Sequence, residues 1–343
     1  MTNQKQTSIA VFFGGKISQH LVLIRKAAKK LGVRLDLISY NRVCFDTEEN
    51  SVKIRGNLGK FGDGGEWINI NDYDVLFFRT TGKHWEEVDL IANELNPSAT
   101  ASPKAPPFDK GGKALSKKPV IVDPIILSGK PSMACKAYQM LALNKAGIEV
   151  PKTVYGSLWF LYETMNNLGS SKSSPYFTFP IIIKGSGGDR GTRVFKADNL
   201  VELEELVRKL RKSETEEGKR YMLQEFIPND GDYRVLVLGD KCLGVMKRSS
   251  QSESEFRNNY SAGGSVEVAD LPENIKQLAI KAAKVCGLAI AGVDVAFRDN
   301  DQTKPVIWEV NKGPQFKGFM QATGIDVPSE IVKFLVKLCD NSQ

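Results

Sequence analysis

The order of apolar runs along the chain predicts an α/β protein in which a doubly wound parallel sheet precedes antiparallel sheets. Ile9–Phe13 is an apolar run typical of a buried strand, a helical pattern ends near Leu31, and Val33–Tyr40 again has strand character. This β-α-β order is typical of parallel sheets. Farther along, Asp232–Leu238 and Lys241–Arg248 flank a Gly-Asp turn, which predicts an antiparallel hairpin.

The composition is that of an ordinary globular protein, with 41% hydrophobic and 25% charged residues. A chain of 343 residues is long for one compact core, so about two or three packed units are expected. The formal net charge of +7 and the pI near 9.0 favour an acidic partner such as a polyphosphate, an acidic peptide or RNA. A charge of this size can also serve solubility alone.

The cysteines and histidines indicate the cellular compartment and limit the kinds of catalytic and metal-binding site that the chain can form. The 5 cysteines are widely spaced and form no CxxC pair, which favours a reducing compartment over a disulfide framework or a zinc site. The 2 histidines argue against a histidine-based triad or a metal site built from several histidines. The first residues lack a signal-peptide pattern and no later run reaches membrane length, so we expect a cytoplasmic protein without a membrane partner.

The first unit has a candidate ligand position and an unusual insert. Asp74–Phe78 is another strand pattern, and Arg79 and Thr80 follow it directly. Because ligands gather at the carboxyl ends of strands in open α/β sheets, these residues are candidates to hold an anionic substrate. The alternative is that Arg79 pairs with a surface carboxylate. Residues 96–119 are rich in Pro, Ala, Ser, Gly and Lys, which predicts a flexible loop or linker.

The middle of the chain contains a glycine-rich loop between two strands. After a helix predicted over Pro131–Ala146, the strand Ile181–Ile183 leads into Lys184, a loop ending at Gly191 and a second strand, Thr192–Lys196. Such a loop can approach phosphate oxygens with its backbone N–H groups, although an empty hairpin tip remains an alternative. The position of the lysine before the glycines excludes a Walker P-loop, and the glycine spacing excludes a Rossmann turn.

Further apolar patterns predict the remaining elements. Asp198 is predicted to cap a helix that runs to about Arg211, and Glu214–Lys219 is predicted to be a charged turn. Other strands and helices are expected over Tyr221–Ile227, Pro272–Cys286 and Val327–Leu338.

A second hairpin near the C-terminus carries the residues with the clearest chemistry. Gly292–Arg298 and Pro305–Asn311 read as paired strands, and period-2 alternation puts Glu309 and Asn311 on one side. If Asp294 lies on the same side, two carboxylates and an amide oxygen converge, a set that suits Mg²⁺ or Mn²⁺. Because Mg²⁺ keeps few protein ligands, its other partner would be a nucleotide triphosphate. The alternative is that the carboxylates are strand-end charges turned to solvent.

Taken together in order, these motifs resemble those of the ATP-grasp ligases, and most closely the RimK-type branch. The resemblance covers roughly Lys130 to the C-terminus and is carried by these segments: Lys184 with its glycine loop, 224–227, 232–234, 256–259, the hairpin with Asp294, Glu309 and Asn311, and 323–326. It implies a two-lobed ATP-grasp fold with antiparallel sheets after the α/β domain. The expected units are an N-terminal domain over 1–128, a central or lid lobe over 129–228, and a C-terminal lobe over 229–343.

The resemblance also implies roles for individual residues. It implies metal binding by Asp294, Glu309 and Asn311, and catalytic roles for Arg248 and Arg257 near the reacting groups. Residues matching the nucleotide-binding positions are Lys136, Lys184, Gly187, Gly188, Gly191, Glu225, Phe226, Ile227, Asp232, Asn258 and Asn259. The loop 312–317 departs from the family pattern, which puts the acceptor substrate in doubt.

The implied function is an ATP-dependent ligase that joins a carboxylate, through an acyl phosphate, to an amino group. ATP and Mg²⁺ or Mn²⁺ are the implied cofactors, and an acidic peptide or a ribosomal protein is a candidate acceptor for an amino acid such as glutamate. Two alternatives stay open: a small-metabolite ligase of the same fold, and an ATP-binding module without turnover. The oligomeric state is open.

Overall fold

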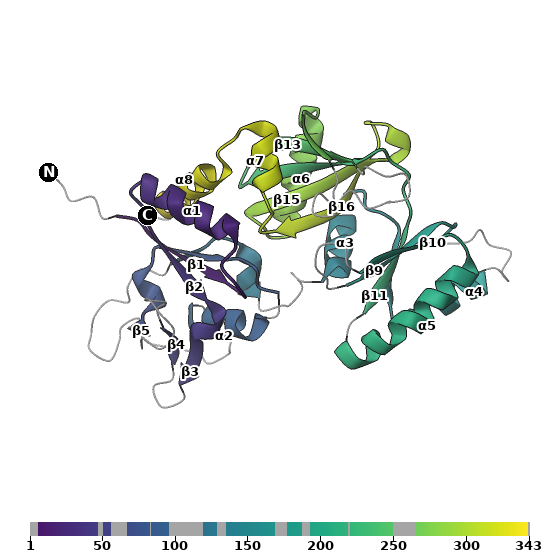
Figure 1. Cartoon of the computed structure of the whole chain (residues 1–343), viewed down its shortest axis with the longest axis horizontal. Helices are drawn as coiled ribbons and strands as arrows, with labels where there is room; N and C mark the ends of the chain where they lie inside the picture. The colour runs from purple at the N-terminus through teal and green to yellow at the C-terminus, as the bar shows by residue number, and fades with distance from the viewer. Residues whose placement is uncertain are drawn as a thin grey trace.

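The computed structural model of the chain describes residues 6–46, 51–55, 67–82, 84–95, 119–128, 135–168, 177–186, 193–218, 220–249 and 265–341 (Figure 1). The predicted insert over 96–119 lies outside the described residues except for its last position. Gly187, Gly188, Gly191, Arg257, Asn258 and Asn259 also lie outside them. In the part of the chain that is described, no helix is both long and apolar enough to cross a membrane.

The N-terminal sheet is parallel, as predicted. Its strand order is β2-β1-β6-β7, and every pair in it runs parallel. All six residues of β1 are buried because helices cover both faces of a sheet of this type. The helix α1 begins after Ser18, whose side chain accepts a hydrogen bond from the Leu21 backbone N–H. The elements are β1 (Ser8–Phe13), α1 (Gln19–Lys30), β2 (Arg34–Ser39), β6 (Val75–Phe78), α2 (Trp85–Leu95) and β7 (Val120–Ile121).

A small antiparallel sheet in the same unit was not predicted. Its strands are β3 (Val43–Asp46), β4 (Ser51–Arg55) and β5 (Trp67–Ile68), in the order β3-β4-β5. Ile54 of β4 is fully buried in the cluster that contains Ile70 and Tyr73. The strands are too short to give a clear alternation in the sequence.

A second sheet, antiparallel throughout, has the order β10-β9-β11-β8. Its elements are β8 (Thr153–Gly156), α4 (Leu158–Leu168), β9 (Ile181–Gly185), β10 (Val194–Ala197), α5 (Leu200–Glu217) and β11 (Tyr221–Glu225). The prediction for α5 was wrong at both ends, because Asn199 is the N-cap and the helix includes the predicted charged turn as far as Glu217. Glu214 is buried there, and its Oε1 accepts a hydrogen bond from the Leu158 backbone N–H at 3.0 Å.

The third sheet contains both predicted hairpins in the order β14-β13-β12-β15-β16, and it is antiparallel. Its strands are β12 (Asp232–Leu238), β13 (Lys241–Ser249), β14 (Ser265–Ala269), β15 (Ile290–Phe297) and β16 (Pro305–Lys312). The accompanying helices are α3 (Lys136–Lys145), α6 (Glu273–Val285), α7 (Lys317–Thr323) and α8 (Val327–Asp340). The short α7 was not predicted, and α3 begins later than the predicted Pro131.

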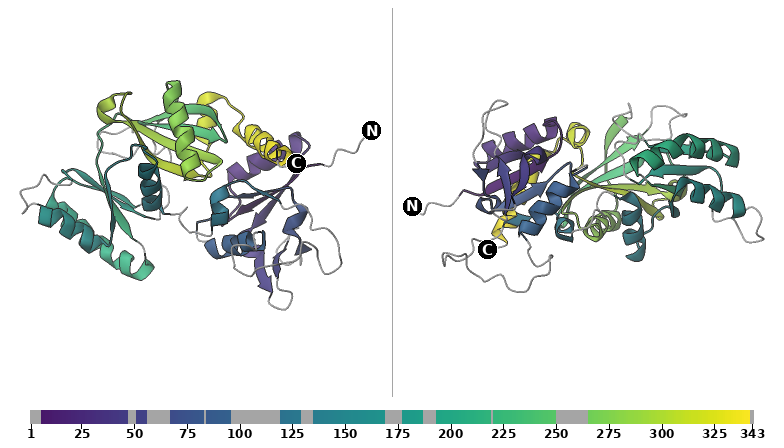
Figure 2. Two further views of the ribbon diagram at one scale, coloured as in Figure 1. Left: turned by 180° about the vertical axis from the view of Figure 1, so that it is seen from behind. Right: turned by 90° about the horizontal axis from the view of Figure 1, so that it is seen from below.

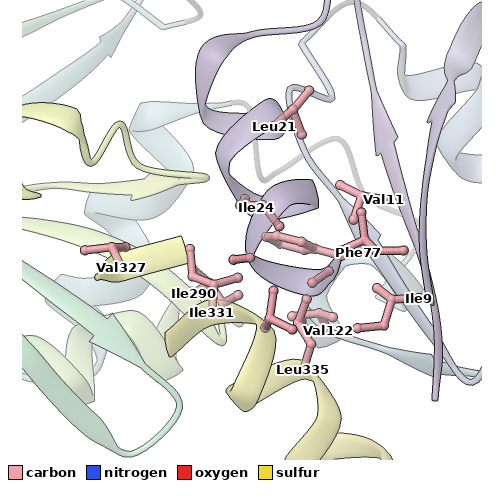
Figure 3. Close-up of a cluster of buried hydrophobic side chains, with 14 of the residues drawn as sticks. Ile9, Val11, Leu21, Ile24, Phe77, Val122, Ile290, Val327, Ile331 and Leu335 are labelled. Carbon is pink, nitrogen blue, oxygen red and sulfur yellow. The ribbon is translucent and has the colours of Figure 1, made fainter. Parts of the chain in front are cut away.

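One hydrophobic cluster joins the two ends of the chain. The five-stranded sheet lies between the other two large sheets, and α8 packs beside α1 (Figures 1 and 2). Ile24 of α1, Phe77 of β6 and Ile331 of α8 meet in this cluster (Figure 3). Ile290 at the start of β15 belongs to it as well, so the parallel sheet is packed directly against the sheet that carries the predicted metal ligands.

Candidate active site

The predicted metal ligands share one face of the five-stranded sheet. Asp294 of β15 pairs directly with Glu309 of β16, and Gly292 pairs with Asn311. Paired residues point to the same face, and so do residues two apart on one strand. The Nδ2 of Asn311 lies 3.1 Å from the Oδ2 of Asp294. The three side chains therefore lie on one face of the sheet, with Asn311 beside Asp294.

Asp294 lies in a network of buried ion pairs. Arg234 donates to both of its carboxylate oxygens, at 2.7 and 2.8 Å. Arg248 lies 3.0 Å from Oδ2 of Asp294 and also donates to both oxygens of Asp232, at 2.6 and 2.8 Å. The four side chains are buried or nearly so. Bidentate pairs of this kind fix the plane of each carboxylate as well as its charge.

The two aspartates of this network respond differently to burial. Burial alone would raise the pKa of Asp294, but Arg234 and Arg248 outweigh it and hold the pKa below its usual value. At Asp232 burial prevails and raises the pKa, Arg248 opposing this and the nearby charge of Asp294 adding to it. Asp294 is therefore the carboxylate held ready in its anionic form.

Two predicted lysines reach this face from other elements. Lys136, the first residue of α3, places its Nζ 3.1 Å from Oε1 of Glu309, and its backbone N–H donates to Ser186 O at 3.0 Å. Lys184 lies on β9 of the second sheet. Burial and the charge of Lys136 lower the pKa of Lys184 to about 8, while Glu309, Asp294 and Asp232 act against this shift. The carboxylates of the third sheet therefore act electrostatically on Lys184, which belongs to the second sheet.

The end of β11 and the segment after it connect the two sheets, and side chains fix their position. Oε1 of Glu225 accepts hydrogen bonds from the Lys152 backbone N–H and from Nη2 of Arg298, both at 2.7 Å. Arg298 also reaches Glu149 at 2.9 Å. Burial would raise the pKa of Glu225, but these donors outweigh it and lower the pKa.

The neighbouring predicted residues are also placed. Ile227 is buried, and the ring of Phe226 lies under Nζ of Lys196, 5.1 Å from its centroid. A linker held in this way keeps its backbone in a fixed position between the sheets.

The donor set fits a hard divalent cation. Asp294, Glu309 and Asn311 offer carboxylate and amide oxygens, the ligands that Mg²⁺ and Mn²⁺ prefer. Among the described residues no group of three or more His, Cys, Asp or Glu side chains is arranged for a metal, so the amide of Asn311 is needed to complete the set. The Asn311 amide can turn to exchange its nitrogen for its oxygen, and Oδ1 of Asp294 accepts from Arg234 alone in the described contacts.

Sequence reasoning missed Arg234 and Arg298 as site residues. Arg234 lies two residues after Asp232 on the same strand, so strand alternation already placed both on one face. Arg298 directly follows β15, and no local pattern links it to Glu149 or Glu225, which are far away in sequence. The structure also shows that Nη2 of Arg248 contacts both Asp232 and Asp294, while its Nε binds Asp232.

Solved structures with the same arrangement of sheets are ATP-grasp enzymes. An ATP-grasp ligase PsnB, complexed with a phosphomimetic variant of a minimal precursor, Mg and ADP, has a TM-score of 0.63 at 17% identity, over 97% of this chain and 99% of that one. The D-alanine–D-alanine ligase of Bacillus anthracis has a TM-score of 0.60 at 16% identity, over 98% of each chain. At these identities the likeness establishes the fold, which is that of the ATP-grasp class.

The sequence itself defines the family within that class. A family model described as RimK-like ATP-grasp domain matches residues 133–335, more than half of the chain. A probable alpha-L-glutamate ligase 2 of Hahella chejuensis is 33% identical over 204 residues, which are 59% of this chain and 62% of that protein. The chain therefore belongs to the RimK-like ATP-grasp family, and the match spans a little under two thirds of that relative.

Proposed function

We propose that the chain is an ATP-dependent ligase that forms an amide bond between a carboxylate and an amino group. The observation that carries this proposal is that Lys136 contacts Glu309 and that Lys184 is influenced by the charges of Glu309 and Asp294, on the sheet face that also carries Asn311. Lysines that face oxygen ligands suited to Mg²⁺ are suited to binding a triphosphate, because its oxygens can contact both the lysines and the ion. Membership of the RimK-like ATP-grasp family supports the same reading.

The nucleotide would lie between the second and third sheets. Lys136 and Lys184 would hold its phosphates, and the backbone from Glu225 to Ile227 would meet the adenine. We keep Asp232 as a residue of this site, with Arg248 setting its orientation. Residues proposed for the same nucleotide but outside the described part are Gly187, Gly188, Gly191, Asn258 and Asn259, and Arg257, proposed as catalytic, also lies outside it.

Asp294, Glu309 and Asn311 would hold Mg²⁺, with Mn²⁺ as the alternative ion. The bound ion would neutralise phosphate charge and polarise the γ-phosphoryl group. The protein's own part is to keep Asp294 anionic and correctly turned through Arg234 and Arg248. Lys136, which now pairs with Glu309, would be free to turn to a phosphate once the carboxylate binds the ion.

The reaction has two steps. A carboxylate oxygen of one substrate attacks the γ-phosphorus of ATP, the bond to the β-phosphate oxygen breaks, and ADP leaves. An uncharged amine then attacks the carbonyl carbon of the acyl phosphate, the C–O bond to phosphate breaks, and the nitrogen gives up its proton to water or to the departing phosphate. In this proposal, Lys184 and Arg248 would supply fixed positive charge that stabilises the transferring phosphoryl group and the developing oxyanion.

The proposed substrates are based on the names of similar proteins and not on the geometry of the site. The Hahella chejuensis relative is named a probable alpha-L-glutamate ligase 2, and the PsnB ligase has also been solved in complex with a precursor peptide, PsnA2. We therefore propose glutamate as the amino acid and a peptide or protein carboxylate as its acceptor. The formal charge of +7 is compatible with an acidic acceptor.

The test is acceptor-dependent turnover. The protein is incubated with ATP, Mg²⁺, glutamate and a pool of peptides, ADP is measured, and the products are searched by mass spectrometry for the mass of an added residue. The expected result is ADP formation that requires an acceptor. ATP binding without such turnover would favour a binding module, and no ATP binding by calorimetry would refute both functions.

A further inference from the structure

The segment after Asn311 leaves the candidate metal site and enters the N-terminal unit. Gly313 has φ +64°, a left-handed conformation that favours glycine, and it turns the chain directly after β16. Pro314 is buried, and Phe316 is fully buried in the cluster that contains α1 and β6. This turn therefore connects a candidate ligand to the core of the parallel sheet.

Arg79, next to the parallel sheet, binds the turn at Gly313 and Pro314 through hydrogen bonds. It follows β6 and is 4% exposed, and its Nη2 donates to the carbonyl oxygens of Gly313 at 3.0 Å and of Pro314 at 3.3 Å. Its guanidinium lies against the rings of Phe77 and Phe316, at 5.6 and 6.0 Å from their centroids. The expected pairing with a surface carboxylate is thus replaced by buried bonds to backbone oxygens.

The backbone of Arg79 is itself held by neighbouring elements. Its N–H donates to the carbonyl oxygen of Phe12 at 2.9 Å, and its carbonyl oxygen accepts from the hydroxyl of Tyr40 at 3.1 Å. Because these bonds fix the backbone of Arg79, its side chain can hold the turn at Gly313 and Pro314 in a defined position.

The turn at Gly313 and Pro314 also contacts the strands that carry the candidate ligands. Gly292, paired with Asn311, has no Cβ, and a Cβ there would lie 2.9 Å from Cβ of Pro314 and 3.4 Å from Cδ of Arg234. Pro314 therefore packs against Gly292 close to Arg234, which binds both oxygens of Asp294. Contacts run without a break from Arg79 through Pro314 to the strands that carry Asp294 and Asn311.

A second bond ties the other ligand-bearing strand to the same sheet. Asp123, just after β7, is 1% exposed, and its Oδ1 accepts from the backbone N–H of Ala289 at 2.9 Å. Ala289 immediately precedes β15. The parallel sheet thus fixes the start of β15 with Asp123 and the end of β16 with Arg79.

We propose that Arg79 is a positioning residue for the metal site, acting through Pro314 on the geometry of Asn311 and Asp294. The inference rests on the proposed function, since it assumes that these side chains hold the ion. It assigns the N-terminal unit a part in setting metal affinity. Arg79 itself touches none of the reacting groups in this assignment.

The experiment measures metal affinity apart from turnover. Mn²⁺ binding in the presence of a non-hydrolysable ATP analogue is followed by electron paramagnetic resonance for the full chain and for Arg79→Met. The variant is expected to bind Mn²⁺ about 10-fold more weakly, the lower end for residues that orient metal ligands, and to need more Mg²⁺ for half-maximal ADP formation. Arg79→Lys, which keeps a donor and the charge, should fall between the two.

A matched control separates this effect from general damage to the parallel sheet. Arg34 lies on β2, pairs with Asp36 and has a side chain that is 54% exposed. Arg34→Met should leave Mn²⁺ affinity unchanged. Thermal unfolding of each variant shows whether it is folded at the assay temperature.

Three outcomes would overturn the inference. Unchanged Mn²⁺ affinity in folded Arg79→Met refutes it while leaving the proposed function intact. If that variant does not fold, Pro314→Gly, which removes the side chain packed on Gly292, decides the matter, and unchanged Mn²⁺ affinity there refutes it. Failure of the unaltered protein to bind Mn²⁺ with the analogue refutes the proposed function and this inference with it.

Discussion

Two clusters of buried charged side chains lie at the C-terminal hairpin. They differ in whether their positive and negative charges balance. In the Asp294 cluster (Asp232, Arg234, Arg248 and Asp294), positive and negative charges are equal in number and are joined by contacts of 2.6–3.0 Å. In the Arg79 cluster (Arg79, Asp123 and Lys312), the cations outnumber the carboxylate. Within the described structure, Nη1 of Arg79, Oδ2 of Asp123 and Nζ of Lys312 are buried without a hydrogen-bond partner.

The difference separates two uses of buried charge. Carboxylates that must present oxygen atoms to an ion need fixed direction, and bidentate arginines supply it. The Arg79 cluster instead binds backbone groups, Gly313 and Pro314 through Arg79 and Ala289 through Asp123, so its bonds fix the chain path and leave some charge uncompensated. Charge pairing is therefore the property of the candidate site, and backbone anchoring is the property of the cluster that supports it.

The largest effect should come from removing an arginine of the Asp294 cluster. Arg248→Met leaves two buried carboxylates without their shared cation, and we expect a loss of about 3–5 kcal/mol in the free energy of unfolding. Lys312→Met removes a buried ammonium that has no hydrogen bond in the described structure, and it should leave stability unchanged or raised. Urea denaturation measures both. Equal losses in the two variants would abolish the distinction between the clusters.

Glu309→Gln should lower the activity without lowering the stability. Glu309 is paired with Lys136, and their side chains are 30% and 22% exposed, so neutralising it should leave the unfolding midpoint unchanged. Loss of a candidate ligand charge should lower kcat by about 100-fold or more. Glu330→Gln, which breaks the exposed pair with Lys333 on α8, is the control and should retain full activity. Full activity of Glu309→Gln would contradict the assignment of the site.

The pH dependence of ATP binding should report Lys184. Its pKa is lowered to about 8 in the free protein, and bound phosphates would raise it again. Below pH 8 the lysine is charged in both states, so affinity is constant. Above pH 8 binding must take up a proton, and affinity should fall by up to about tenfold per pH unit. Calorimetry from pH 7 to 9.5 measures this, and Lys184→Met should bind more weakly with a flatter profile. A wild-type profile no steeper than that of the variant would show that Lys184 does not contact the nucleotide.

The smallest effect concerns Lys312. Burial, together with the charge of Arg79, lowers its pKa from 10.5 to about 8, with Asp123 opposing the shift. Between these values the unfolded chain binds more protons, so stability should rise with pH across this window, and the penalty should be fully present below it. Lys312→Met should show less of this rise than the wild type in urea denaturation at pH 7.5 and 10. Identical slopes would mean that the Lys312 ammonium is well solvated.

Sequence patterns anticipated most of what depends on short-range periodicity. The β-α-β opening and the hairpin with Asp294 and Glu309 follow from alternating or helical apolar runs, and the direct pairing of these carboxylates is a consequence of hairpin register. The end of α5 was missed because Glu214 looks like a turn residue in the sequence, whereas in the fold it bonds to the backbone at Leu158. Tertiary contact overrode local composition there.

Contacts between distant segments could not be read from the sequence. Arg79 and Gly313 are separated by 234 positions, and nothing local to either one indicates the bond between them. The departure of the loop 312–317 from the family pattern gave no sign that the Lys312 ammonium is buried near Asp123 and Arg79. Sequence alternation gives the face of a strand, but the partner across a domain junction depends on the packing of the whole chain.

The shared cluster of α1, β6 and α8 has a practical consequence for dissecting the protein. The stretch that matches the family, residues 133–335, ends within α8, and Ile331 and Leu335 of that helix are fully buried among side chains from the N-terminal unit. A fragment cut at the family boundary would expose this apolar surface to water, so we expect it to aggregate on expression. Shortened versions intended for crystallisation or labelling should keep the first strand and helix together with the last one.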